Sequence, residues 1–302
     1  ESAAQFRTYH KFLILNVSPI ENVSFEAEVL DLSYYELIFH VSEKYDVRVG
    51  KIWVPFGSSP FHHYYGGIQG DPFSGLLVPN VWAEFGGTVG GSLYTDETIA
   101  VDADVFLVRG FESELGNVLN LSSGGSDGNI AIGARTKFGI GGKFSVWGSV
   151  MYNRFGEIEA ADDGDEVKGE VLLWGGDIVT EFGLIDVPLL RDLRVRAAFA
   201  RADVKDELLV DPVNSKEFWY YKYGDYVELT HRGYRGVVPR VRYGTIIDFD
   251  DRVTNNDSHN WDLALLYRMG RHVLFLAEYQ INMEEVNERN NDLARFQIVF
   301  EF

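Results

Sequence analysis

The residues best suited to chemistry in this sequence gather in one stretch, residues 55–80. Its middle holds two adjacent histidines among aromatic residues, and Asp71 is its one charged residue. Imidazoles can ligate a metal, and an imidazole beside a carboxylate can act as a general base. Aromatic rings can stack on a passing solute or pack against a neighbouring subunit. The residues concerned are Phe61, His62, His63, Tyr64, Tyr65 and Asp71.

Each of these chemistries makes a different demand on the fold. Neighbouring side chains of an extended chain point apart, so His62 and His63 can share a metal only across a turn, and we expect neither a metal nor a cofactor. Either histidine with Asp71 could form an acid–base pair at the rim of the protein. Rings that line a channel would instead filter solutes, whereas rings on a surface loop would pack in an oligomer.

The rest of the chain offers little catalytic machinery. It has no cysteine, which excludes disulfides, thiolate metal sites and a cysteine nucleophile, and it has no His-Glu-x-x-His sequence. The formal net charge of −19 argues against a general nucleic-acid binder, because contacts to phosphates need a basic surface. We therefore predict that the protein is not an enzyme, and we keep a catalytic barrel as an alternative.

The elements that must position these residues show a period of two. The last nine residues, 294–302 (ARFQIVFEF), carry apolar side chains at every second position and mostly polar ones between them. Successive side chains of a strand point to opposite faces, so this segment is a strand with one apolar face. The same period recurs at residues 260–269 and 272–283, which a short turn joins into a hairpin.

Segments of this kind fill the chain, and many are ten to fourteen residues long. Soluble strands average about five or six residues, whereas roughly nine to eleven cross a bilayer on a tilt. Short and long connections alternate, as in outer-membrane barrels. The pattern predicts one all-β domain over residues 1–302, a transmembrane antiparallel up-and-down barrel of about sixteen strands, with fourteen as the alternative. The expected long outer loops are 55–80, 110–128, 155–167 and 204–224.

Charged residues of both signs alternate with apolar residues in the predicted strands. They would share the face that lines a water-filled lumen, whereas an occluded structural or adhesin barrel would need apolar filling there. The acidic excess falls mainly in the expected long loops, as a solvated rim. The candidate lining residues are Arg135, Arg194, Arg196, Arg240, Arg242, Asp102, Asp104 and Glu278.

Aromatic residues fall toward the ends of the predicted strands, where an interfacial girdle is expected. The chain has no run of eighteen apolar residues, which excludes a transmembrane helix. The girdle candidates are Trp53, Trp82, Trp174, Trp261, Tyr152, Tyr243, Tyr267 and Tyr279.

With this pattern, the chain resembles the outer-membrane porins, whose mature chains typically end in Phe on a strand of this kind. Residues 47–51 (VRVGK) and 54–57 (VPFG) look like the VGxxxxPFG stretch of the phosphate-selective porin superfamily. Residues 277–280 (AEYQ), ahead of the last strand, are similar to the same porins. Residues 55–80 contain no lysine or arginine, so the resemblance does not extend to phosphate selectivity.

The resemblance implies a passive, water-filled diffusion channel for small hydrophilic solutes or ions in the outer membrane of a Gram-negative bacterium. It also implies that the barrel insertion machinery reads Phe302 as an assembly signal. We expect outer-membrane lipids as partners and a homotrimer as the assembly. Within this channel, the rings at Phe61 to Tyr65 would narrow the lumen.

Overall fold

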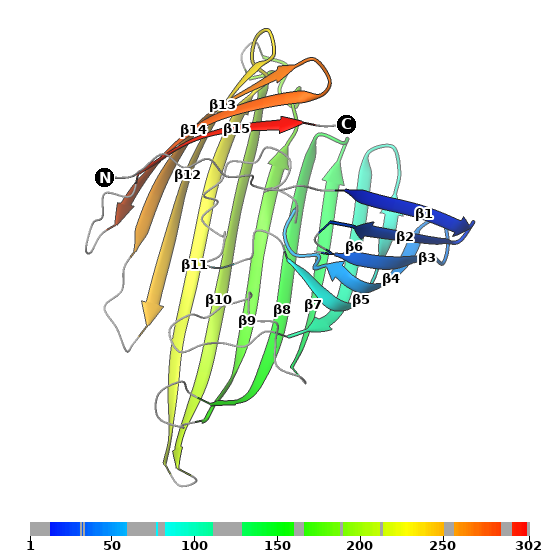
Figure 1. Cartoon of the computed structure of the whole chain (residues 1–302). Helices are drawn as coiled ribbons and strands as arrows, with labels where there is room; N and C mark the ends of the chain where they lie inside the picture. Colours follow the sequence, from blue (N-terminus) through cyan, green and yellow to red (C-terminus); the bar gives the residue numbers. More distant parts are fainter. Residues whose placement is uncertain are drawn as a thin grey trace.

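A computed structural model describes residues 13–30, 32, 34–58, 77, 82–110, 129–159, 166–187, 190–211, 214–250, 257–284 and 292–300. Fifteen strands occur in this part of the chain, each antiparallel to the next, and the sheet bends into a curved wall (Figure 1). The strands are β1 (Ile14–Ile20), β2 (Val23–Glu28), β3 (Tyr35–His40), β4 (Tyr45–Trp53), β5 (Ala83–Thr95), β6 (Ile99–Arg109), β7 (Ile130–Ile140), β8 (Phe144–Glu159), β9 (Glu166–Thr180), β10 (Leu193–Asp211), β11 (Asn214–His231), β12 (Val237–Asp250), β13 (Ser258–Met269), β14 (Val273–Glu284) and β15 (Leu293–Phe300).

The wall differs in height around its circumference. Strands β8 to β11 are 15 to 19 residues long and form a tall wall, whereas β1 to β3 have 6 or 7 residues and form a low wall. A strand needs about nine to eleven residues to cross a bilayer on a tilt. The tall wall therefore extends beyond the membrane, and the low wall is shorter than the bilayer is thick. No helix in the described part of the chain is long and apolar enough to span a membrane.

The two faces of the sheet have opposite character. On β6, Val105 and Leu107 are 55% and 51% exposed, whereas the alternate residues Phe106 and Val108 are each 1% exposed. The exposed side chains of the other strands are apolar as well, for example Phe296 and Ile298 on β15. An exposed apolar outer face is the surface that a transmembrane barrel presents to lipid.

Most of the predicted girdle lies on this outer face. Trp174 and Trp261 are exposed there, as are Tyr152, Tyr267 and Tyr279. The prediction is wrong for Trp82, which is 3% exposed and packs against Phe56 with the ring centroids 5.9 Å apart. Trp82 lies directly before β5 and belongs to the buried apolar cluster of the interior.

Two predictions about element boundaries need correction. The predicted loop at 204–224 is wrong, because β10 and β11 pair through that region up to Asp211 opposite Asn214. Aromatic residues occupy both faces there and hide the period of two: Trp219 is 46% exposed outside, and Tyr220 is 1% exposed inside. The predicted loop at 155–167 is shorter than expected, since β8 reaches Glu159 and β9 begins at Glu166.

The sequence predicts about sixteen strands, with fourteen as the alternative, and the described part of the chain contains fifteen. Residues 6–12, which the sequence pattern also places in the first strand, lie outside the described residues. Only Glu21 and Asn22 separate β1 from β2. Within the described part, β1 and β15 each pair with one strand.

The inner face of β4 to β11 carries a packed apolar cluster toward the long connections, which we call the apolar zone. The prediction that charged residues line the inner face does not extend to this zone, which is apolar filling of the kind that the occluded alternative requires. Burying a large apolar side chain contributes about 1.5–3 kcal/mol, so the zone is a hydrophobic core built inside the wall. Its members are Ile52, Val54, Phe56, Leu77, Trp82, Phe106, Val108, Ala131, Met151, Val171, Leu173, Ala200, Ala202, Val204 and Tyr220.

Candidate functional site

The chain turns inward directly after β4. Pro55 has no N–H to donate to a strand partner, so regular pairing stops there. Gly57 follows with a φ of +71°, in the left-handed region that favours glycine. Its N–H donates to Ser149 Oγ on β8 at 2.9 Å, and its carbonyl accepts from Arg135 Nη1 on β7 at 3.3 Å. Residues 54–58, which we call the inturned segment, therefore lie across the inner face.

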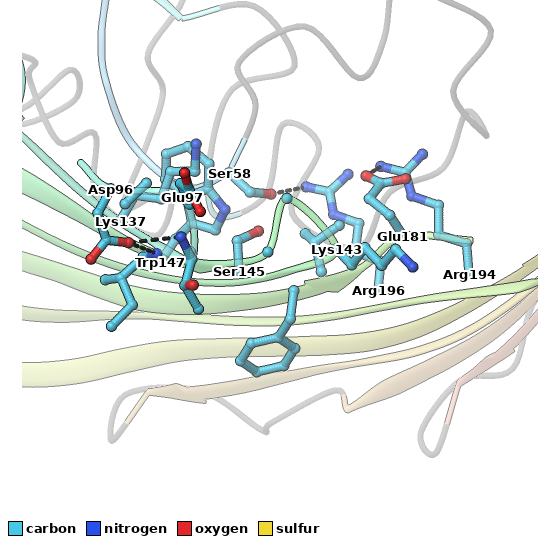
Figure 2. Close-up of a pocket in the computed structure, with 18 residues that line it drawn as sticks. Ser58, Asp96, Glu97, Lys137, Lys143, Ser145, Trp147, Glu181, Arg194 and Arg196 are labelled. Atoms are coloured by element: carbon cyan, nitrogen blue, oxygen red, sulfur yellow. Dashed lines mark hydrogen bonds and ion pairs between the residues drawn. The ribbon is translucent and has the colours of Figure 1, made fainter. Parts of the chain in front are cut away.

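Ser58 continues these contacts to the next two strands. Its hydroxyl donates to Asp177 Oδ1 on β9 at 2.8 Å and accepts from Arg196 Nη2 on β10 at 2.7 Å (Figure 2). Arg196 and Asp177 also pair directly at 3.4 Å, and both side chains are 8% exposed. Side chains from four successive strands, β7 to β10, thus hold two adjacent residues of the inturned segment.

The inturned segment lies at the boundary between two kinds of surface. Val54 and Phe56 are buried within the apolar zone, whereas Gly57 and Ser58 contact charged and hydroxyl groups. Strand β10 shows the change along its own length, since Arg194 and Arg196 precede Ala200, Ala202 and Val204 on the same face. We call the charged half the charged zone. It consists of Asp102, Asp104, Arg135, Lys137, Asp177, Arg194, Arg196, Glu228, Arg240 and Arg242.

Ion pairs between neighbouring strands neutralise most of the charged zone. Arg135 binds Asp104 on β6 through both Nε and Nη2, at 2.8 and 2.6 Å, and Lys137 lies 3.4 Å from Asp102. The Arg135 guanidinium and the Lys137 ammonium also lie 5.1 and 5.0 Å from the ring centroid of Trp147. Cations held between a carboxylate and an aromatic face are fixed in position.

A second group of charges surrounds Glu228 on β11. Arg242 Nη2 donates to Glu228 Oε2 at 2.7 Å, and Arg240 Nε lies 3.8 Å from Oε1. The strand register also places Arg196 opposite Glu228, and the guanidinium groups of Arg196 and Arg242 lie 5.6 and 4.8 Å from the Tyr226 ring. One carboxylate thus balances arginines from both adjacent strands.

The structure places all eight candidate lining residues on the inner face. Those on β6, β7, β10 and β12 belong to the charged zone. Glu278 on β14 lies 3.4 Å from Arg295 on β15. Phe61, His62, His63, Tyr64, Tyr65 and Asp71, the candidate constriction residues, lie outside the described residues, as does Phe302.

Sequence reasoning missed Glu228, Ser58 and Ser149. The run of residues 226–230 (YVELT) alternates, so its pattern places Glu228 on the same face as its neighbours Tyr226 and Thr230. No such signal existed for the serines. Ser149 is far from Gly57 and Ser58 in the sequence, and only the fold brings it against Gly57.

A cavity of about 350 Å³ opens beside the charged zone at the short turns. It lies between the turns at 96–98 and 141–143, and Ser58 of the inturned segment reaches its wall. Figure 2 shows Asp96, Glu97 and Lys137 on one side and Lys143, Glu181 and Arg194 on the other. Because both signs of charge line it, the cavity suits water, ions and hydrophilic solutes.

The turn at 96–98 keeps a negative charge beside the cavity. Tyr94 donates its hydroxyl to Asp96 at 2.7 Å, and the N–H groups of Ile99 and Thr98 donate at 2.6 and 2.7 Å. These hydrogen bonds, the Tyr94 bond foremost, lower the pKa of Asp96 below its ordinary value. In the described part of the chain, no group of three or more His, Cys, Asp or Glu residues could hold a metal ion.

The curved antiparallel sheet, the apolar outer face and the charged inner zone define the class of protein: the chain has the fold of a bacterial outer-membrane β-barrel. No protein-family profile and no curated protein matches the sequence. The fold is similar to those of solved structures whose sequence identity to this chain is low.

Three of these structures illustrate the likeness. OmpT of Vibrio cholerae with loop L8 deleted, an outer membrane protein, has a TM-score of 0.57 at 14% identity, covering 94% of this chain and 87% of that one. The trimer form of in-vitro folded OmpT has a TM-score of 0.55 at 13% identity, covering 90% and 79%. A porin has a TM-score of 0.55 at 12% identity, covering 96% and 91%.

Proposed function

We propose that this chain is a porin, a passive water-filled channel for small hydrophilic solutes or ions, and that the inturned segment begins its constriction. The observation that carries the proposal is the attachment of Gly57 and Ser58 to β7, β8, β9 and β10. A chain segment held across the inner face by directed hydrogen bonds narrows the interior at a fixed level, as a size filter requires.

The charged zone supports the same function. Its side chains are fixed by ion pairs beside a cavity lined by both signs of charge. Fixed charges along a water-filled path select ions by sign and attract hydrophilic solutes. With a net charge of −19, the chain should show a mild preference for cations at low salt, which fades as the salt screens the field.

The likeness to the phosphate-selective porin superfamily supports the same position for the constriction. Val49, Gly50 and Lys51 of the motif lie on β4, and Pro55, Phe56 and Gly57 start the inturned segment. The motif therefore coincides with the place where the chain leaves the wall. Phosphate selectivity is not part of the proposal, because residues 55–80 contain no lysine or arginine.

We further propose a homotrimer in which the low wall faces the other copies. Strands of 6 or 7 residues leave the outer surface of β1 to β3 shorter than the bilayer, and a neighbouring copy would cover it in place of lipid. The trimer form of OmpT is a precedent in a similar fold. Chemical cross-linking in native membranes, followed by denaturing gels, should give a band at three times the chain mass.

A single cysteine tests the channel directly, because the chain has none of its own. The S58C variant should conduct in planar bilayers, and a charged methanethiosulfonate reagent should lower its single-channel conductance stepwise. V89C, at a position 55% exposed on the lipid-facing outer face, should keep its conductance in the presence of the reagent. Complete modification of S58C with unchanged conductance would exclude Ser58 from the channel wall, and a silent wild type would favour an occluded barrel.

A further inference from the structure

Three side chains on the low wall and its neighbour form a hydrogen-bonded chain. Ser24 lies on β2, His40 ends β3 and Asp46 is the second residue of β4. Ser24 Oγ is 2.9 Å from His40 Nε2, and His40 Nδ1 is 2.8 Å from Asp46 Oδ1. A hydroxyl, an imidazole and a carboxylate linked in this order are the constellation by which serine hydrolases are recognised on unrelated folds.

The strand register explains why the three groups meet. His40 lies directly opposite Asp46 on β4, and Ser24 lies opposite Ile38, one step along the same face from His40. Alternate residues of a strand share a face, so Ser24 and His40 face the same side across a diagonal pair. The 41–44 turn between β3 and β4 keeps His40 and Asp46 adjacent at the end of the wall.

The chemistry of the partners fixes the direction of the chain. An ionised carboxylate only accepts hydrogen bonds, so Nδ1 carries the proton donated to Asp46, and Nε2 is left as the acceptor for the Ser24 hydroxyl. Arg48 Nη2 lies 3.9 Å from the other oxygen of Asp46. Arg48 also pairs with Glu36 on β3 at 3.3 Å.

The imidazole and the carboxylate of this hydrogen-bonded chain are open to water. The His40 and Asp46 side chains are 41% and 33% exposed, whereas Ser24 is 6% exposed as a residue. The Ser24 hydroxyl is thus nearly buried beside an exposed imidazole, which favours small substrates over folded polypeptides.

We propose that Ser24 is the nucleophile of a hydrolytic site for small esters on the inner face of the barrel. Ser24 Oγ attacks the ester carbonyl, the new Oγ–C bond forms, and its proton passes to His40 Nε2. The C–O bond to the alcohol then breaks, and His40 returns the proton to the departing alkoxide. Water attacks the acyl-serine by the same route in reverse and releases the acid. Asp46 orients the imidazole and stabilises its cationic form.

This site is independent of the channel. Ser24 and His40 make none of the contacts that hold the inturned segment, which involve β7 to β10. A variant that removes the nucleophile should therefore leave conduction intact. Loss of the hydrolytic site and loss of the channel can then be measured separately on the same protein.

A fluorophosphonate probe tests the nucleophile on the full chain folded in detergent. The Ser24 hydroxyl displaces fluoride, and mass spectrometry of the digested protein should find the phosphonyl group on Ser24. S24A should lose this labelling while its single-channel conductance stays that of the wild type. H40Q should slow labelling by roughly 100-fold or more, the usual contribution of a general base. D46N should also slow it.

The matched control is S149A. Ser149 is 7% exposed on the same inner face, and its hydroxyl accepts a hydrogen bond from Gly57 N–H, whereas the Ser24 hydroxyl donates to a histidine. S149A should be labelled at the wild-type rate. An unlabelled wild type, equal labelling of Ser149, or unchanged rates in H40Q would each overturn the proposal, and the three groups would then be a hydrogen-bonded ladder only. Hydrolysis of p-nitrophenyl acetate by the wild type above the S24A background would support it.

Discussion

The apolar zone and the charged zone lie on the same strands and the same face, yet they are held together by different forces. In the apolar zone, side chains such as Phe106 and Leu173 are almost completely buried and pack on the inturned segment. In the charged zone, each residue is fixed by a partner on a neighbouring strand, and several stay partly exposed, such as Lys137 at 32%. One half behaves as a hydrophobic core, and the other is a network of ion pairs.

In the proposed channel, ordinary core packing places the constriction. Phe56 and Trp82 anchor the inturned segment where the zones meet, and hydrogen bonds to Gly57 and Ser58 set its level. Stability should therefore depend mainly on the apolar zone, and conduction mainly on the charged zone. Substitutions in each zone test this division.

The largest effect on stability is expected from F106A. Phe106 is 1% exposed in the apolar zone, and truncation of a buried Phe typically costs about 3–5 kcal/mol. Equilibrium unfolding in detergent and urea measures the loss. L107A is the matched control, since Leu107 is the next residue and is 51% exposed on the outer face. Equal losses in the two variants would contradict the existence of a core inside the wall.

The next effect concerns the pair of Arg242 with Glu228, whose side chains are 1% and 11% exposed. R242L removes a charged hydrogen bond and should lower the free energy of unfolding by about 1.5–3 kcal/mol. The carboxylate that remains should also shift the zero-current potential toward cations. The double variant E228L/R242L should recover much of the loss, because a buried ion pair can be replaced by apolar residues at little cost. A double variant less stable than either single one would argue against this pairing.

A smaller effect is expected at the cavity, where Arg194 and Glu181 lie 3.3 Å apart with side chains 40% and 45% exposed. Exposed pairs contribute about 0.2–1 kcal/mol, so R194Q and E181Q should unfold almost as the wild type does. In a salt gradient at low ionic strength, R194Q should favour cations more than the wild type and E181Q less. The two shifts should vanish in about 1 M salt, where screening is nearly complete. Shifts of the same sign would show that these residues lie away from the ion path.

The smallest expected effect is the contribution of Asp96 to the loss of stability at low pH. Its pKa is lowered in the folded protein by hydrogen bonds from Tyr94, Ile99 and Thr98. A lowered pKa contributes stability above the unfolded value, near 3.9 for aspartate, and this contribution is lost as the pH falls through the folded value. D96N should therefore lose less stability than the wild type between pH 6 and pH 2. E97Q, its neighbour in the turn, should follow the wild type, and identical acid profiles of D96N and wild type would contradict the assignment.

Much of the fold could be predicted because the side chains of a strand alternate between its two faces, so the sequence of a strand with one apolar face alternates as well. The alternation at residues 260–269 and 272–283 gave β13 and β14 to within two residues, and the candidate lining residues lie on the predicted face. The prediction failed where both faces of a strand carry aromatic residues, as at Trp219 and Tyr220. It also failed for Trp82, since a sequence pattern does not distinguish an aromatic ring at a lipid interface from one in a core.

The sequence by itself determined most of the strands and the face on which the candidate lining charges lie, because these follow from local geometry. Only the tertiary structure decided that Gly57 and Ser58 meet Ser149, Asp177 and Arg196, and that Ser24, His40 and Asp46 form one chain. Contacts of this kind depend on the register and curvature of the whole sheet. They are set by the sum of many strand pairings, which no local pattern of residues encodes.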